Sequence, residues 1–182
     1  MTRTMLAGAA TGLALGAMFM AAAGVAATHP AGPQAAVRRF VAAFNRGDVA
    51  AEESVHDADA TIIDEFAPHI WRGAGAVRAW ASDLEKSDKA AGDSNDHLVL
   101  AKPTRLEVEG HAAYAVFPAT VTYTEKGKAL AETGRMTFAF HRAAGAWKIA
   151  GWAWTGGAPH AAVTSATAKP APKTAGAAKP KP

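Results

Sequence analysis

The sequence predicts an α+β fold, a cone-shaped roll of three N-terminal helices packed on a curved, mostly antiparallel β-sheet. Apolar residues first recur at helical spacing, whereas strand-like runs separated by short turns fill residues 98–154. Strands joined in sequence by short turns pair antiparallel, and helices that precede such a sheet cover one of its faces. This arrangement predicts a cone with an open mouth, a place where small ligands are often held.

Two of the expected helices carry an apolar stripe at spacing i, i+3, i+4 and i+7. The first begins at Pro33, a residue suited to the first helical turn, and a second short helix capped by Asp48 runs to about His56. The third follows Gly75, and the polar stretch 87–96 after it predicts a loop. The stripes are Val37, Phe40, Val41 and Phe44 in the first helix, and Val77, Trp80, Ala81 and Leu84 in the third.

Strand-like patterns fill most of the remaining domain. A strand leads to Asp64, and a short return strand is expected at 69–72 after the break at Pro68. Pro118 lies inside a long strand and predicts a β-bulge, since proline cannot donate to a sheet ladder. The remaining strand regions are 98–109, interrupted at Pro103, then 112–124, 129–141 and 146–154.

One carboxylate, Asp64, is expected on an apolar strand face. Alternate residues of a strand share a face, so Asp64 points the same way as Ile62 and Phe66. A carboxylate among buried side chains must find partners or raise its pKa, and this makes Asp64 a functional candidate. The alternative is a structural aspartate satisfied by backbone donors or by Trp71 or Trp80.

Composition excludes several classes of function. The chain has 182 residues, no cysteine and a formal charge of +3, but the tail lysines and Arg3 account for the excess. Residues 28–160 alone carry about −2, which gives no support to nucleic-acid binding. No recognised metal-ligand spacing or nucleotide-binding fingerprint is present, so we expect neither a metal nor a cofactor.

The two ends of the chain differ from the domain between them. Residues 1–27 resemble a signal peptide, with Arg3 before an uncharged run and small residues at the expected cleavage site. The alternative is an uncleaved anchor helix. Cleavage predicts a periplasmic or secreted domain over residues 28–160 without a stable membrane anchor. Residues 161–182 are rich in Ala, Pro and Lys and predict a disordered tail.

The order of these motifs resembles the nuclear transport factor 2-like superfamily, and within it the SnoaL-like and ketosteroid-isomerase-like domains. The resemblance rests on D-A-T-x-x-D at residues 59–64, R-G-x-x-A-V-R-x-W at 72–80 and G-A-W-K-I-A-G-W-A-W at 145–154. It covers roughly residues 33–157 and implies the fold. It does not fix a reaction, because this fold hosts isomerases, cyclases, dehydratases and non-catalytic binders.

The resemblance to the isomerases can be followed residue by residue. Asp64 falls where such isomerases keep the general base that moves a proton next to a carbonyl. Phe40 occupies the position of their helical tyrosine, and Met136 aligns with their protonated acid. Neither can donate a hydrogen bond to a developing oxyanion, and each lost donor costs about 2.7–4 kcal/mol in comparable sites. The sequence therefore argues against steroid isomerisation and leaves a related pocket open.

Three functions follow as hypotheses. The first is a binder of a small apolar molecule, and the second is a proton-transfer isomerase, dehydratase or cyclase with Asp64 as base. The third is an interaction module that forms a homodimer through the outer sheet face, where Arg135 is expected. The residues expected to line the pocket with Asp64 are Phe40, Phe66, Trp71, Trp80, His97, Tyr114, Met136 and Phe138.

Overall fold

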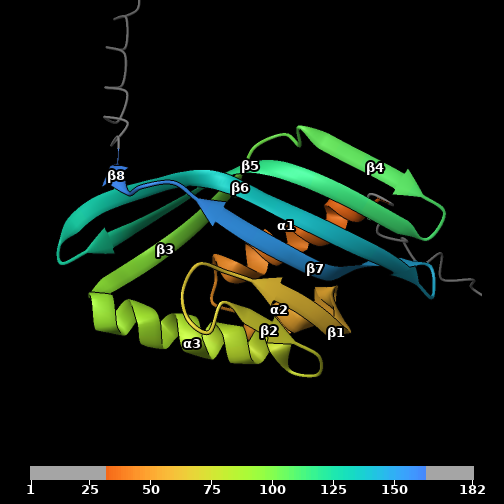
Figure 1. Cartoon of the computed structure of the whole chain (residues 1–182), viewed down its shortest axis with the longest axis horizontal. Helices are drawn as coiled ribbons and strands as arrows, with labels where there is room; N and C mark the ends of the chain where they lie inside the picture. The colour runs from red at the N-terminus through yellow and green to blue at the C-terminus, as the bar shows by residue number, and fades with distance from the viewer. Residues whose placement is uncertain (1–31, 163–182) are drawn as a thin grey trace, which may run out of the picture.

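The computed structural model describes residues 32–162 as one layer of helices beneath a curved sheet (Figure 1). The expected signal peptide and most of the expected tail lie outside the described residues. The helices are α1 (Pro33–Phe44), α2 (Val49–Val55) and α3 (Ala76–Ala91). The strands are β1 (His56–Ile63), β2 (Ile70–Arg72), β3 (Asp93–Leu100), β4 (Arg105–Glu109), β5 (Ala112–Glu125), β6 (Lys128–Ala143), β7 (Ala146–Gly156) and β8 (His160–Ala161).

The eight strands form a single sheet in the order β2-β1-β7-β6-β5-β3. β4 pairs with one half of β5 beside β3, and β8 pairs with the start of β6. All pairs are antiparallel except β1 with β7, which run parallel. The predicted α+β class and the mostly antiparallel sheet are confirmed.

The core lies between the helices and the concave face of the sheet. The side chains of Phe40, Phe138, Ile62 and Ile149 are fully buried there. Phe40 of α1 contacts the ring of Phe138 at a centroid distance of 6.1 Å, edge-on. The apolar stripes of the helices and the apolar faces of the strands therefore pack together in one core. The long strands β5 and β6 cross over the helices on one side of this core (Figure 1).

Pro118 does not produce the bulge that the sequence predicts. β5 pairs with β6 without interruption, and Pro118 lies opposite Arg135. On its other side β5 changes partner at this point, from β4 along residues 112–116 to β3 along residues 119–125. Proline is tolerated because it sits in the gap between the two partner strands, where no ladder donor is required.

The predicted loop at 87–96 is also wrong. α3 continues to Ala91, and β3 begins at Asp93 after Gly92, which has a φ of 85°. Only a left-handed residue at the helix end reverses the chain so quickly, and glycine adopts that conformation without a steric penalty. The polar residues of this stretch therefore belong to regular elements, and this places several carboxylates at fixed positions.

The strand β7 contains an irregularity that the alternation of apolar and polar residues does not reveal. The pairing of β7 with β6 shifts between Ala139 and Phe140, so one extra residue enters β7 near Ala150. Trp147 and Ile149 before the shift, and Trp152 after it, are all buried on the concave side. Across residues 32–162, no helix is long and apolar enough to cross a membrane.

Candidate functional site

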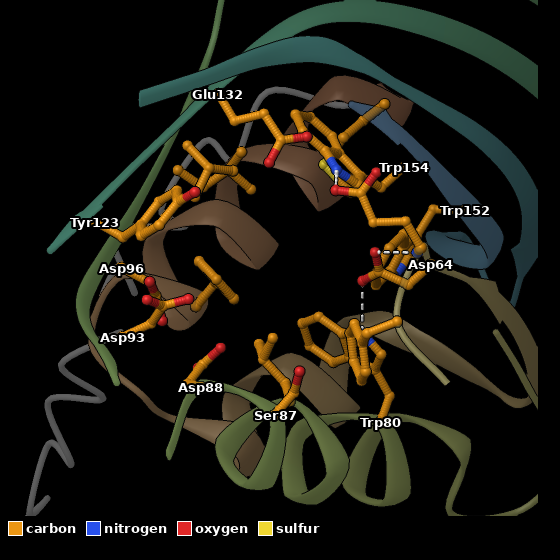
Figure 2. Close-up of a pocket in the computed structure, with 17 residues that line it drawn as sticks. Asp64, Trp80, Ser87, Asp88, Asp93, Asp96, Tyr123, Glu132, Trp152 and Trp154 are labelled. Carbon is orange, nitrogen blue, oxygen red and sulfur yellow. Dashed lines mark hydrogen bonds between the residues drawn. The ribbon is translucent and has the colours of Figure 1, made fainter. Parts of the chain in front are cut away.

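A cavity of about 210 Å³ opens between α3, the end of β1 and the concave face of the sheet (Figure 2). One side of it is apolar and strongly aromatic, and the other side is acidic. In Figure 2 the three tryptophans lie across the cavity from Asp88, Asp93 and Asp96. The main apolar side chains are Phe44, Phe66, Trp80, Met136, Trp152 and Trp154.

Asp64 stands at the aromatic side of the cavity, directly after β1. The indole Nε1 of Trp80 donates to Asp64 Oδ2 at 2.8 Å, and the backbone N–H of Glu65 donates to Oδ1 at 2.8 Å. Burial raises the pKa of the Asp64 carboxyl, and these two hydrogen bonds oppose that rise. The Asp64 carboxylate is thus fixed in orientation by two hydrogen bonds and has increased basicity. It faces a space that a small molecule can occupy.

Three aspartates form the acidic side of the cavity, and we call them the aspartate trio. Asp88 comes from the last turn of α3, and Asp93 and Asp96 come from β3. Burial and the neighbouring Asp96 raise the pKa of Asp88 to about 7. The nearby Asp96 carboxylate makes ionisation of Asp88 less favourable, so a proton on Asp88 relieves the repulsion between the two groups.

A second pair of carboxyl groups, those of Glu65 and Glu132, lines the cavity, and Figure 2 shows Glu132 at its upper rim. Burial raises the pKa of Glu132 to about 7, and the neighbouring Glu65 carboxylate adds to the rise. Trp154 Nε1 donates to Glu65 Oε1 at 2.8 Å. Glu132 is therefore partly protonated near neutral pH, and its protonated form can donate a proton.

The structure brings together only part of the predicted site. Phe66, Trp80 and Met136 line the cavity with Asp64. Of the two partners proposed for Asp64, Trp80 is the one that bonds it, whereas Trp71 donates to Asp83 at 3.0 Å.

The other predicted lining residues lie elsewhere. Phe40 and Phe138 are packed in the core, and Trp71 is buried outside the cavity. His97 is exposed, and Tyr114 is 39 % exposed on the outer face of the sheet. Tyr114 and Tyr123 differ by an odd number of residues on an unbulged strand, so only Tyr123 faces the cavity.

Sequence reasoning missed most of the polar side of the cavity. The aspartate trio lies in the stretch interpreted as a loop, where no periodic pattern indicated an orientation. Glu132 was detectable, because it shares strand parity with Met136, Phe138 and Phe140 on β6. Trp152 and Trp154 also line the cavity, although they were not among the predicted lining residues.

Within the described part of the chain, no group of three or more His, Asp or Glu side chains has the geometry to hold a metal ion. The aspartate trio is therefore not arranged as a metal centre. The cavity instead combines an apolar wall, a basic carboxylate and protonatable acids.

The fold agrees with a comparison against known families. A profile of the SnoaL-like domain matches residues 34–153. The chain belongs to the SnoaL-like domain family. The predicted membership of the nuclear transport factor 2-like superfamily is thereby confirmed. No curated protein matches the chain.

Several solved structures share the SnoaL-like fold with this chain. A nuclear transport factor 2-like protein from Salmonella enterica is 20 % identical, with a TM-score of 0.55, over 71 % of this chain and 91 % of its own. A ketosteroid isomerase-like protein from Erwinia carotovora is 16 % identical, with a TM-score of 0.57, over 69 % and 94 %. A hexachlorocyclohexane dehydrochlorinase from Novosphingobium barchaimii is 12 % identical, with a TM-score of 0.60, over 72 % and 90 %. At these identities the likeness shows the fold alone.

We predict that Trp80→Phe raises the pKa of Asp64 further. The change keeps an aromatic ring and removes the N–H that stabilises the charged carboxylate. A carbon-detected NMR titration of the Asp64 side-chain carboxyl measures the shift. Trp71→Phe is the matched control, because its indole bonds Asp83 instead. An unchanged or lower pKa of Asp64 in Trp80→Phe contradicts this assignment.

We predict that the domain loses stability between about pH 5 and pH 8. The folded pKa values of Asp88 and Glu132 are about 7, above the ordinary 3.8 and 4.5, so stability that is present below pH 4 is lost as pH rises through 7. Asp88→Asn should raise the melting temperature near pH 8 by about 2–4 °C and flatten this dependence.

Thermal denaturation followed by circular dichroism tests this dependence. Asp59→Asn is the control, because Asp59 is exposed on β1 and outside the cavity. Stability that increases from pH 5 to pH 8, or a lower melting temperature for Asp88→Asn near pH 8, contradicts the prediction.

Proposed function

We propose that this SnoaL-like domain binds a small, mainly apolar molecule in the cavity beside Asp64. The observation that carries the proposal is the wall of Trp80, Trp152 and Trp154 around an open space of about 210 Å³. Aromatic side chains left facing a cavity lose contacts that a flat apolar ligand restores. The volume is below the roughly 300–1,000 Å³ of pockets for drug-sized ligands, which favours a molecule of one or two rings.

Binding of 2-naphthol tests this proposal, since it is a neutral two-ring probe that reports through tryptophan fluorescence. Val121→Trp places an indole in the cavity and should weaken binding by at least about tenfold. Val99→Trp is the control, because Val99 is 52 % exposed and outside the cavity lining. Equal binding by the two variants would remove the cavity as the binding site.

A proton-transfer enzyme is the second candidate, and the environment of Asp64 favours it. The pKa of Asp64 is raised and its carboxyl faces the cavity, and the same cavity is lined by Glu132, whose pKa of about 7 leaves it partly protonated near neutral pH. Glu132 and the Tyr123 hydroxyl could supply the donors that Phe40 and Met136 lack. The reaction class is an isomerisation, dehydration or cyclisation that begins with removal of a proton from carbon.

Ring opening of 5-nitrobenzisoxazole tests Asp64 as a base. The base removes the C3 proton, the N–O bond breaks and a cyanophenolate forms, with no further reactant needed. We predict that Asp64→Asn lowers the rate by at least about 100-fold and that Asp59→Asn leaves it unchanged. A full rate in Asp64→Asn means that Asp64 is not the base.

We also propose that the mature chain is a periplasmic or secreted homodimer that begins near Thr28. The leader composition supports export, and Ile63, Val99 and Tyr114 expose apolar surface on the outer sheet face, where Arg135 also lies. Native mass spectrometry of the protein secreted by its own host should give twice the mass of residues 28–182. A monomeric mass would contradict the homodimer, and a chain that retains residues 1–27 would contradict cleavage of the leader.

A further inference from the structure

The cavity has an unbalanced charge. Six of its lining residues carry carboxyl groups, and none of the 17 is Lys, Arg or His. Two basic side chains near these carboxyls lie outside the cavity lining. Lys126 Nζ lies 3.8 Å from Glu125 Oε1, and His69 is exposed, with its Nδ1 3.2 Å from the Asp64 carbonyl oxygen. The six carboxyl residues are Asp64, Glu65, Asp88, Asp93, Asp96 and Glu132.

An adjoining cavity of about 350 Å³ continues this acidic region beneath α3. It shares Asp88 and Asp96 with the first cavity, and Glu52 of α2 lines it. Glu52 is only 2 % exposed, and its Oε2 is covered and has no hydrogen-bond partner among residues 32–162. Asp93 Oδ1 is likewise covered and unpaired.

Buried carboxyl oxygens without donors are unfavourable, since each has lost water and gained no hydrogen bond. Among residues 32–162, no Lys, Arg or His side chain lines either cavity. A ligand that donates hydrogen bonds and carries positive charge would satisfy both requirements. The tryptophans on the opposite side would accept its apolar part, and their ring faces also attract a cation.

We propose that the cavity is specific for an organic ammonium ligand, in which a primary or secondary amine is joined to an apolar ring or chain. The ammonium group lies against the aspartate trio, and the apolar part lies against Trp80, Trp152 and Trp154. This inference rests on the proposed binding function and adds the charge of the ligand to it.

The span of the cavity suits a short molecule with its charge at one end. The trio and the tryptophan wall face each other across one open space in Figure 2, so a single ligand can touch both. An ammonium group has two or three N–H donors and can bond more than one of the three carboxylates. An anionic ligand of the same shape would meet six carboxyl groups and no compensating cation.

The proton content of the free site gives an independent signature. Asp88 has a pKa of about 7 because of burial and Asp96, and burial also raises the pKa of Asp93. A bound ammonium group stabilises the charged carboxylates and lowers these pKa values. Binding near pH 6.5 should therefore release protons, and affinity should increase from about pH 5 to pH 8.

The test compares three probes of one shape by isothermal titration calorimetry: 2-phenylethylammonium, neutral 2-phenylethanol and anionic 3-phenylpropanoate. We expect the ammonium probe to bind at least about tenfold more tightly than the alcohol and the anion to bind most weakly. Titrations in buffers of different ionisation enthalpy measure the released protons.

The double variant Asp88→Asn/Asp96→Asn should lower the affinity for the ammonium probe by at least about tenfold and change the affinity for the alcohol by less than about twofold. Asp59→Asn/Glu109→Gln is the matched control, because it removes two exposed carboxylates outside the cavity. If the double variant does not fold, the single change Asp93→Asn gives the same comparison. Equal affinity of the ammonium and alcohol probes, or tighter binding of the anion, overturns the inference and leaves the proposed binding function intact. If none of the three probes binds and 2-naphthol does not bind either, both the ammonium preference and the proposed binding function are overturned.

Discussion

The hydrogen bond between Trp80 and Asp64 is the interaction on which the cavity depends. It joins α3 to the residue that directly follows β1, at a donor–acceptor distance of 2.8 Å. The same indole packs edge-on against Trp152 at a centroid distance of 5.0 Å. One side chain therefore fixes the helix against the sheet, forms part of the aromatic wall and orients the carboxylate that faces the open space.

The fold beyond this contact explains why the cavity stays open on one side. α1 covers the concave face where Phe40 meets Phe138, and this region is filled completely. α3 loses its apolar stripe after Leu84, and its last turns present Ser87 and Asp88 to the sheet. Polar groups at that end cannot close over apolar strands, so the helix and the sheet enclose a space whose two sides differ in polarity.

Much of this architecture was predictable from local patterns. The spacing of the helical stripes gave α1 and α3, and strand parity correctly turned Asp64 toward the apolar face. Patterns failed where a tertiary contact decides the structure. Pro118 is accommodated by a change of neighbouring strand, and residues 93–96 become a strand because β5 offers a free edge to pair with.

The acidic side of the site could not be predicted for the same reason. The aspartate trio comes from a helix end and a strand start that meet only after Gly92 reverses the chain. Its members are ordinary surface residues in the sequence and become close neighbours in the fold. The apolar side of the cavity could therefore be predicted in part from periodic patterns in the sequence. The acidic side could not, because its position depends on the turn at Gly92.

The most direct test is a crystal structure of the mature chain soaked with 2-phenylethylamine near pH 8. We expect density in the cavity, with the ring against Trp80, Trp152 and Trp154 and the nitrogen within hydrogen-bond distance of Asp88, Asp93 or Asp96. A cavity filled by the protein's own side chains, with the probe excluded, would contradict the proposed binding site. A ring bound with its nitrogen turned away from the aspartates would retain the cavity and refute the charge preference.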